Sequence, residues 1–228
     1  MSVISDSSIA LKVQNLGKEV SSPEGALTIL EDISFDINAG EIVALVGPSG
    51  AGKTTLLALL AGLDCPTSGD VELCGESLPA LTEDGRASLR GRNVGFVFQS
   101  FHLISSLTAL ENVMLPLELN DTNDARKRAA TALESVGLGR RTGHYPRQLS
   151  GGEKQRVAIA RAFVTEPKVL FADEPTGNLD TASGERVIDL LFDLNRKSGT
   201  TLVLVTHDTK LAARCERVLT IDSGKLVF

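Results

Sequence analysis

The chain has 228 residues, of which 42% are hydrophobic, and its formal net charge at pH 7 is −6. A chain of this length can bury one substantial core, built from one or two lobes, but hardly two independent domains, so we expect one compact unit. The negative charge excludes a bulk positive field that would gather nucleic acid or anionic lipid, so an anionic ligand would have to be held locally. No apolar run approaches the roughly 18 to 20 residues of a membrane-spanning helix, so we expect any membrane role to come through a partner.

The first elements can be predicted from simple patterns. Residues 1–8 are acidic and rich in serine, unlike a secretory signal, which is basic and then apolar. We expect a flexible N-terminal tail there and a folded domain over residues 9–228. Within that domain Ile33, Phe35 and Ile37 alternate with polar residues, which is the period-two pattern of a half-buried strand. Antiparallel β structure is therefore predicted early in the chain.

A different kind of strand is predicted over residues 41–46, where the run EIVALV is almost continuously apolar and stops at a glycine. Such a strand is covered on both faces, as in a parallel sheet. Residues 54–61 follow as a helix, and Gly62 can adopt the left-handed conformation in which helices commonly end. The sequence thus predicts a strand, a glycine-rich loop and a helix in direct succession.

The middle of the chain shows a different hydrophobic pattern. From about residue 76 to residue 147 there is little β pattern, apolar residues recur at helical spacing from 110 to 117, and residues 124–136 form a basic amphipathic stretch. We interpret this as a helical subdomain, about residues 100–165, inserted into an α/β core. Short apolar strands are then predicted at residues 169–172, 201–205 and 218–221, with a helical segment at 183–196. This alternation predicts a parallel sheet with crossover helices.

The glycine-rich loop has the composition of a phosphate-binding loop. It reads Gly47-Pro48-Ser49-Gly50-Ala51-Gly52-Lys53-Thr54 and fits the pattern G-x-x-x-x-G-K-[ST]. Its glycines let backbone N–H groups curl around phosphates, and the helix dipole adds positive potential without a basic surface. Lys53 would reach the β and γ phosphates, the Thr54 hydroxyl would bind Mg²⁺, and Thr55 would lie near the α phosphate. A plain glycine-rich turn, the alternative, does not explain why the pattern stands between a buried strand and a helix.

The strand at 169–172 runs into two acids, Asp173 and Glu174. Two acids at a strand end are common on their own, but a parallel strand that ends beside a phosphate loop delivers a carboxylate to the Mg²⁺ shell. Asp173 is predicted to hold the metal through a bound water. Glu174 is predicted to orient and partly deprotonate the attacking water, which makes it the main catalytic candidate.

Further motifs complete an ordered series. Gln99 follows apolar residues 96–98, Leu149-Ser150-Gly151-Gly152-Glu153 precedes a helical run, and Asn178-Leu179-Asp180 and His207 follow the acids. By itself the serine with its glycines would be only a helix cap, and a lone histidine after a strand is more often structural. Taken in order, however, the motifs span nearly the whole chain and resemble those of the ATP-binding-cassette (ABC) ATPases.

The resemblance implies an α/β fold, namely the P-loop NTPase domain of ABC proteins, with a parallel-sheet core, an antiparallel β subdomain and an inserted helical subdomain. It implies hydrolysis of ATP to ADP and phosphate with Mg²⁺, which Gln99 would help to bind, while His207 would touch the γ phosphate. It also implies a homodimer in which Leu149–Glu153 meets the γ phosphate held by the other subunit, with the Asn178–Asp180 loop at the interface. The other implied partner is an integral membrane permease on the cytoplasmic face of the bacterial inner membrane, and not nucleic acid.

Within this family the chain is similar to the branch of lipoprotein-release, macrolide-efflux and cell-division ATPases, through residues 95–113, 144–163 and 171–180. Members of this branch work with permeases that export small molecules or extract lipids or lipoproteins. Two positions depart from the common pattern: Val20 stands where most members have an aromatic residue that stacks on adenine, and Glu153 stands where glutamine is common. Because stacking on a base contributes about 1 to 3 kcal/mol, Val20 predicts weaker adenine binding or relaxed base selectivity.

Two other functions remain as alternatives at this stage. One is a soluble ABC ATPase that acts on nucleic acid or ribosomes, although the sequence has no tandem cassette, no long coiled-coil insertion and no cysteines at zinc-binding spacing. The other is a regulatory module that has lost catalysis, although Lys53, Asp173 and Glu174 are all present. The residues therefore favour a transport ATPase.

Overall fold

The computed structural model describes residues 9–22 and 25–227. The predicted tail, residues 1–8, lies outside the described residues. The chain divides into two compact units, one formed by residues up to 87 together with residues from 201 onward, and one formed by residues 88–200.

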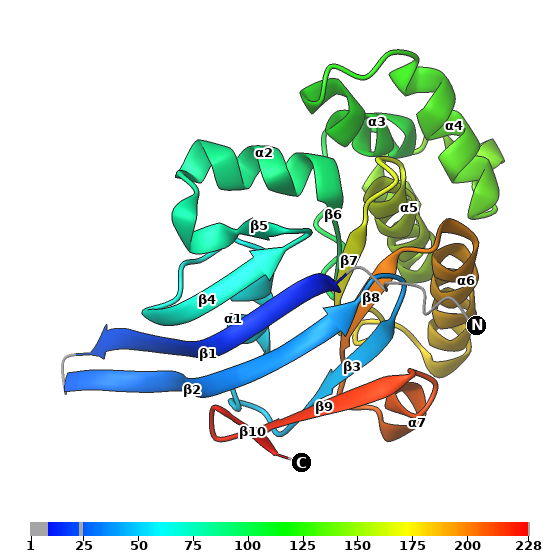
Figure 1. Ribbon diagram of the computed structural model, residues 1–228. Coiled ribbons are helices and arrows are strands. Elements are labelled where there is room, and N and C mark those ends of the chain that lie inside the picture. Colours follow the sequence, from blue (N-terminus) through cyan, green and yellow to red (C-terminus); the bar gives the residue numbers. More distant parts are fainter. Residues whose placement is uncertain (1–8, 23–24, 228) are drawn as a thin grey trace, which may run out of the picture. The chain divides into compact units, whose positions relative to one another are not determined.

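The first unit contains an antiparallel sheet with the strand order β2-β1-β4-β5. Its strands are β1 (Ile9–Ser22), β2 (Gly25–Asn38), β4 (Ser68–Leu73) and β5 (Glu76–Ser77). Figure 1 shows β1 and β2 side by side as a long ribbon. Leu11, Leu16, Ile33 and Ile37 of this ribbon are completely buried. The prediction of early antiparallel β structure is therefore confirmed.

The same unit contains the strand that was expected to be covered on both faces. This strand, β3 (Ile42–Val46), lies between β8 (Thr201–Val205) and β9 (Arg217–Asp222) and is parallel to both, while β10 (Lys225–Val227) pairs antiparallel with β9. β3 and β8 are buried along nearly their whole length, as continuous apolar runs predict. Helix α1 (Lys53–Leu60), the turn η1 (Leu78–Ala80) and the short helix α7 (Thr209–Ala212) complete the unit. Gly62 follows α1 with a φ of 66°, as predicted.

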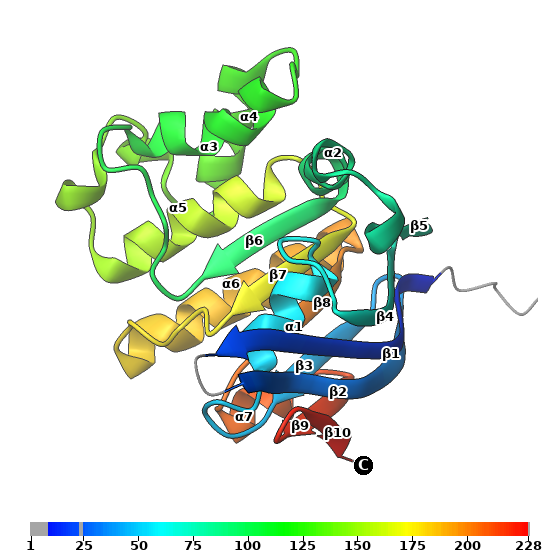
Figure 2. The same cartoon turned by 90° about the vertical axis from the view of Figure 1, so that its left-hand side faces the viewer.

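Helix α2 (Glu83–Asn93) runs from the first unit into the second. The second unit has two parallel strands, β6 (Val94–Phe98) and β7 (Val169–Asp173). Its helices are α3 (Ala109–Leu119), α4 (Ala125–Ser135), α5 (Gly151–Phe163) and α6 (Thr181–Ser198), with the turns η2 (Gly139–Arg141) and η3 (Pro146–Gln148). Figure 2 shows α3, α4 and α5 grouped together. Residues 76–147 hold little β structure, as expected, but they include β6, which was not predicted from the sequence.

β6 could not be recognised from its sequence pattern. Val94, Gly95 and Val97 are buried, and Gly95 is tightly enclosed because a side chain there would meet the Ala162 carbonyl oxygen at 2.5 Å. A strand of five residues that is covered on both faces lacks the alternation by which a half-buried strand is recognised. No helix among the described residues is long and apolar enough to cross a membrane.

Candidate nucleotide-binding and catalytic site

The phosphate loop joins β3 to α1 and packs tightly against its own unit. Gly47 has a φ of 153°, and a Cβ atom added there would lie 2.0 Å from the carbonyl oxygen of Ile221 in β9. Gly52 has a φ of 98°, and its Cβ would lie 2.8 Å from the Leu30 side chain. Both positions therefore exclude any side chain, so that the loop backbone itself can form the phosphate cradle.

The side chain of Lys53 is hydrogen-bonded to the backbone of this loop. The residue is 9% exposed, and Nζ donates hydrogen bonds to the carbonyl oxygens of Gly47 at 2.9 Å and Pro48 at 2.8 Å. Thr54 is exposed and Thr55 is half-buried at the start of α1. An ammonium held over the loop by two carbonyl acceptors can transfer its hydrogen bonds to phosphate oxygens, which are stronger acceptors because they are charged.

His207 leaves the sheet next to the phosphate loop. β8 runs parallel to β3 with Leu45 opposite Val205, and the Thr206 N–H donates to the Leu45 carbonyl at 3.2 Å. His207 follows Thr206 directly and is exposed. The next residue, Asp208, caps α7 by accepting from the N–H groups of Lys210 and Leu211. The structure thus brings His207 and the loop to the same edge of one sheet.

A second group of predicted residues gathers in the other unit. β6 and β7 are parallel with Phe98 opposite Asp173. The residues that follow, Gln99 and Glu174, therefore lie at the same edge of the sheet. The Asn178 side chain donates to the Gln99 carbonyl at 3.0 Å. Gly177 faces the Gln99 side chain so closely that an added Cβ would lie 2.5 Å from Nε2. Gln99, the acid pair and Asn178 therefore form one cluster.

Glu174 has an unusual backbone within this cluster. Its φ is 43°, a left-handed value that is uncommon for residues other than glycine, and its carbonyl accepts from the Gly177 N–H at 3.0 Å. Non-glycine residues with such backbones are concentrated at functional sites, where the surrounding structure fixes them. Glu174 therefore lies in a tight turn, whereas Asp173 is the last residue of β7.

The Leu149–Glu153 signature forms the start of α5. Ser150 is the N-cap: its hydroxyl accepts from the Glu153 N–H at 3.2 Å, and the Glu153 carboxylate accepts from the Ser150 N–H at 2.8 Å. The backbone hydrogen bond from Ser150 is the main reason that the pKa of Glu153 is lowered. The interpretation of this motif as a helix cap is therefore correct. It is compatible with anion binding as well, because the N-terminal amides of a long helix attract anions.

The Asn178–Asp180 loop lies beside the signature. A Cβ added to Gly151 would approach the Leu179 side chain at 3.2 Å. Asp180 is the N-cap of α6 and accepts from the Ser183 N–H at 3.0 Å, and its hydrogen bonds to Ser183 lower its pKa. The two helix starts, α5 and α6, are thus packed against each other by glycine and leucine.

Two supporting residues were not singled out from the sequence. Gln155 is completely buried and donates to the carbonyl oxygen of Pro175 at 2.7 Å, which ties α5 to the loop after the acid pair. Arg161 donates to the Phe101 and His102 carbonyl oxygens, and burial lowers its pKa. The only signal in the sequence is that both are polar residues on a helix whose other inward positions are apolar.

The donor chemistry of these residues suits Mg²⁺. Thr54, Gln99 and Asp173 offer a hydroxyl, an amide and a carboxylate oxygen, which are hard ligands that a magnesium ion accepts together with water and phosphate oxygens. Within the described parts of the chain, no three His, Cys, Asp or Glu side chains gather as a separate metal cluster. The predicted site residues are divided between the two units: residues 47–55 and His207 lie in the first, and Gln99, the signature, the acid pair and residues 178–180 lie in the second.

Comparisons with known proteins agree with this set of motifs. Residues 30–177 match the family described as ABC transporter. The chain is 55% identical to the ABC transporter ATP-binding protein YbbA of Escherichia coli (strain K12), over 95% of this chain and 96% of that protein. It is 49% identical to the lipoprotein-releasing system ATP-binding protein LolD of Xanthomonas campestris pv. campestris (strain 8004), over 95% and 91%. These relatives confirm the branch predicted from the sequence.

A solved structure gives the same answer for the fold. The ATP-binding cassette MJ0796, in a dimeric post-hydrolysis state bound to ADP and Pi, is 40% identical, with a TM-score of 0.88 and coverage of 96% of this chain and 97% of that one. The predicted α/β fold class is therefore confirmed. The chain belongs to the ABC transporter family and is one of its ATP-hydrolysing cassettes.

Proposed function

We propose that this chain hydrolyses Mg²⁺–ATP in a homodimeric sandwich and that the dimer drives an integral membrane permease on the cytoplasmic face of the bacterial inner membrane. The observation that carries the proposal is the register in which Phe98 of β6 lies opposite Asp173 of β7. Because of this register, Gln99 and the acid pair lie at the ends of neighbouring strands, at the same edge of the sheet. A purified chain that releases no phosphate from ATP, with or without a permease, would contradict it.

Each site residue has one role in this proposal. The backbone of residues 47–55 and Lys53 hold the triphosphate, while Thr54, Asp173 and Gln99 supply ligands to Mg²⁺. When bound, Mg²⁺ would neutralise charge that develops on the phosphates. Glu174 orients the attacking water and accepts its proton, and His207 contacts the γ phosphate. The left-handed turn at Glu174 supports this assignment, because it separates the catalytic carboxylate from the metal ligand next to it.

The dimer follows from the presence of a second anion site. The phosphate loop already offers one helix N-terminus, and the capped start of α5 offers another. We infer that Ser150, Gly151 and Gly152 of one subunit contact the γ phosphate bound by the other, with residues 178–180 at the interface. The dimeric state of MJ0796 supports this arrangement.

Val20 is expected to limit adenine binding. It lies on β1 opposite Leu27 and is 39% exposed, in the same unit as the phosphate loop. We expect Val20→Tyr to lower the KM for ATP about 5- to 100-fold, because an aromatic ring can stack on adenine, and to leave kcat unchanged. Steady-state phosphate release with ATP and with GTP measures the change. Ile9→Tyr, an exposed apolar position near the other end of β1, is the control; an equal gain there would show that stacking at Val20 is not the cause.

A groove in the second unit is proposed as the permease-binding surface. It has a volume of about 370 Å³, and the apolar residues that line it include Phe96, Phe98, Leu115, Pro116, Leu119 and Ala162. The His102 ring lies against Phe98, with ring centroids 4.6 Å apart, and Arg161 also lines the groove. An apolar groove between helices suits the apolar face of a short helix, and we propose that a cytoplasmic helix of the permease occupies it.

Leu119→Glu should separate hydrolysis from permease binding. Leu119 is 76% exposed, so a charge there should not disturb folding, but it would be buried unpaired against an apolar helix. We expect the variant to keep the hydrolysis rate of the isolated chain and to lose co-purification with the co-expressed permease. Leu63→Glu, an exposed leucine outside the groove, is the control. Normal co-purification of Leu119→Glu would contradict the assigned surface.

We propose the transported molecule from the branch of the family to which the chain is similar. The likeness to lipoprotein-releasing system proteins supports a permease that extracts or exports lipids or lipoproteins. Small-molecule export is the alternative within the same branch. Accumulation of lipoprotein in the inner membrane after deletion of the chain would support the first, and accumulation of a drug would support the second.

A further inference from the structure

The carboxylate at the end of the signature carries a negative charge at the place where a γ phosphate is proposed to bind. Oε2 of Glu153 accepts the Ser150 N–H at 2.8 Å, so the carboxylate lies over the first turn of α5. An anion there already uses part of the positive potential of the helix N-terminus. It also repels a second anion that approaches the same amides. A signature that ends in glutamate therefore needs a compensating cation if it is to bind triphosphate.

Arg141 is that cation. Its Nε lies 3.2 Å from Oε1 of Glu153, the carboxylate oxygen that the Ser150 N–H does not use. The ion pair connects the turn η2 with the start of α5, within one unit. The charges of Arg141 and Arg156 both help to lower the pKa of Glu153. One oxygen of Glu153 thus caps the helix, and the other is neutralised.

The Arg141 side chain is held from a second direction. Its Nη1 lies 3.0 Å from Nε2 of His144, and because a guanidinium can only donate, Nε2 is the acceptor in this contact. The backbone of the turn is fixed as well, since the His144 N–H donates to the Arg141 carbonyl at 2.9 Å. Although the side chain is 48% exposed, it is therefore oriented toward Glu153 before any ligand binds.

We propose that Arg141 is a positioning residue that neutralises and orients Glu153, so that the signature of one subunit accepts the γ phosphate held by its mate. The proposal rests on the ATP sandwich described above. Arg141 acts through Glu153 and need not touch ATP.

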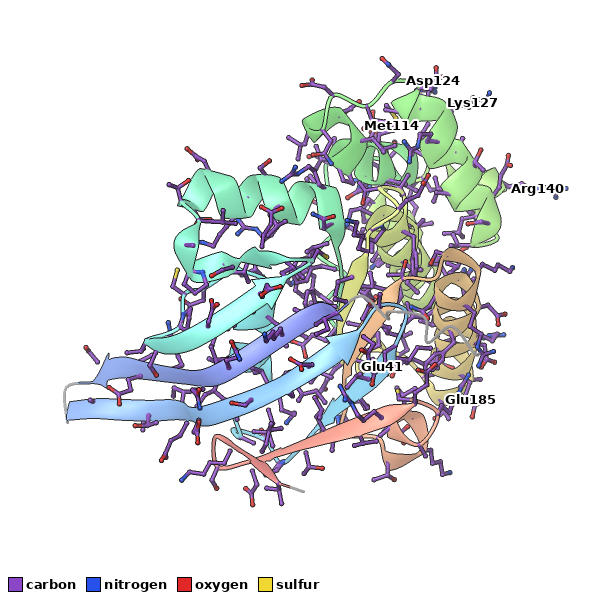
Figure 3. The ribbon with its side chains drawn as sticks, in the orientation of Figure 1. Glu41, Met114, Asp124, Lys127, Arg140 and Glu185 are labelled. Carbon is purple, nitrogen blue, oxygen red and sulfur yellow. The ribbon has the colours of Figure 1, made fainter. Side chains whose placement is uncertain are left out.

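The neighbouring arginine provides a matched control. Arg140 belongs to the same turn and, with Glu134, lines the same hollow as the Arg141–Glu153 pair, but it forms no ion pair among the residues that the structure describes. Figure 3 shows the Arg140 side chain pointing away from the ribbon. Arg140→Gln and Arg141→Gln remove the same charge from adjacent residues, and they differ in the contacts of Arg141 with Glu153 and His144.

The test measures ATP-dependent dimerisation in a Glu174→Gln background, by analytical ultracentrifugation. Arg141→Gln should weaken each site about fivefold, the upper range for a solvent-exposed ion pair, and a dimer with two such sites should therefore dissociate about 25-fold more readily. Arg140→Gln should have no effect, and Arg141→Lys should recover part of the loss. The defect should shrink in 1 M KCl, because salt screens the charges.

The double variant Arg141→Gln/Glu153→Gln separates charge compensation from a structural role. With Glu153 neutral, removal of Arg141 should cost nothing further, so the double variant should dimerise as Glu153→Gln alone does. The same 25-fold loss in both backgrounds, or no loss in either, would overturn the proposal. Failure of the Glu174→Gln parent to dimerise with ATP would instead contradict the sandwich itself, so the two failures can be told apart.

Discussion

Glu174→Gln is expected to lower kcat for ATP hydrolysis about 100- to 10,000-fold while ATP binding persists. Glutamine has nearly the same shape as glutamate but cannot take a proton from water. The left-handed backbone at residue 174 and the bond from the Gly177 N–H to its carbonyl do not involve the side-chain charge, so the turn should be preserved. Phosphate release at saturating ATP measures turnover, and titration with a fluorescent ATP analogue measures binding.

The same variant should remain dimeric in ATP, since the nucleotide that joins the subunits is not consumed. Glu185→Gln is the control, because Glu185 is exposed on α6, forms no ion pair among the described residues, and points away from the ribbon in Figure 3. It should hydrolyse ATP normally. Undiminished hydrolysis by Glu174→Gln would remove Glu174 from the catalytic role and leave the water to be oriented by another residue.

The sequence predicts the parts of this site that depend on short stretches of chain. The strand, loop and helix around residues 42–60 could be predicted because a buried parallel strand, a glycine-rich loop and a helix each have a local pattern. The capping box of Ser150 and Glu153 could be predicted for the same reason, because both partners lie within one turn.

Contacts between distant segments could not be predicted in this way. Arg141 and Glu153 belong to different elements, and nothing in either local pattern shows that they form a pair. The extent of β1 is a second example: its pairing with β2 shifts register at several points, which breaks the period-two pattern over its 14 residues. The tight fit of Gly47 against Ile221 joins segments 174 positions apart and follows only from the fold.

Lys53→Ala is expected to weaken ATP binding about 100-fold, because a charge-assisted hydrogen bond to phosphate is lost and no other side chain of the loop is cationic. Among the described residues Lys53 Nζ is bonded only to main-chain carbonyls of the loop itself, Gly47 and Pro48, so its removal leaves no carboxylate there unpaired. The thermal stability of the chain without nucleotide should therefore change much less than the affinity. Isothermal titration with Mg²⁺–ATP and a thermal melt without nucleotide measure the two quantities.

Lys53→Met and Lys127→Ala make this comparison specific. Methionine keeps most of the buried apolar stem, so Lys53→Met should lose ATP affinity as alanine does while its melting temperature stays closer to that of the unchanged chain. Lys127 is exposed on α4 and its loss should affect neither quantity. An affinity that survives both changes at Lys53 would mean that the loop amides alone hold the phosphates.

The variants at Lys53 and Glu174 should have opposite effects on assembly although both lower turnover. Without Lys53 the triphosphate is held about 100-fold more weakly, so at an ATP concentration that just saturates the parent the subunits have little nucleotide to share and should stay monomeric. Without the Glu174 carboxylate the triphosphate is retained but not cleaved, so the dimer should persist. Combining the two changes should give the monomer, because binding precedes hydrolysis. A double variant that remained dimeric in ATP would show that the subunits associate through surfaces other than the shared nucleotide.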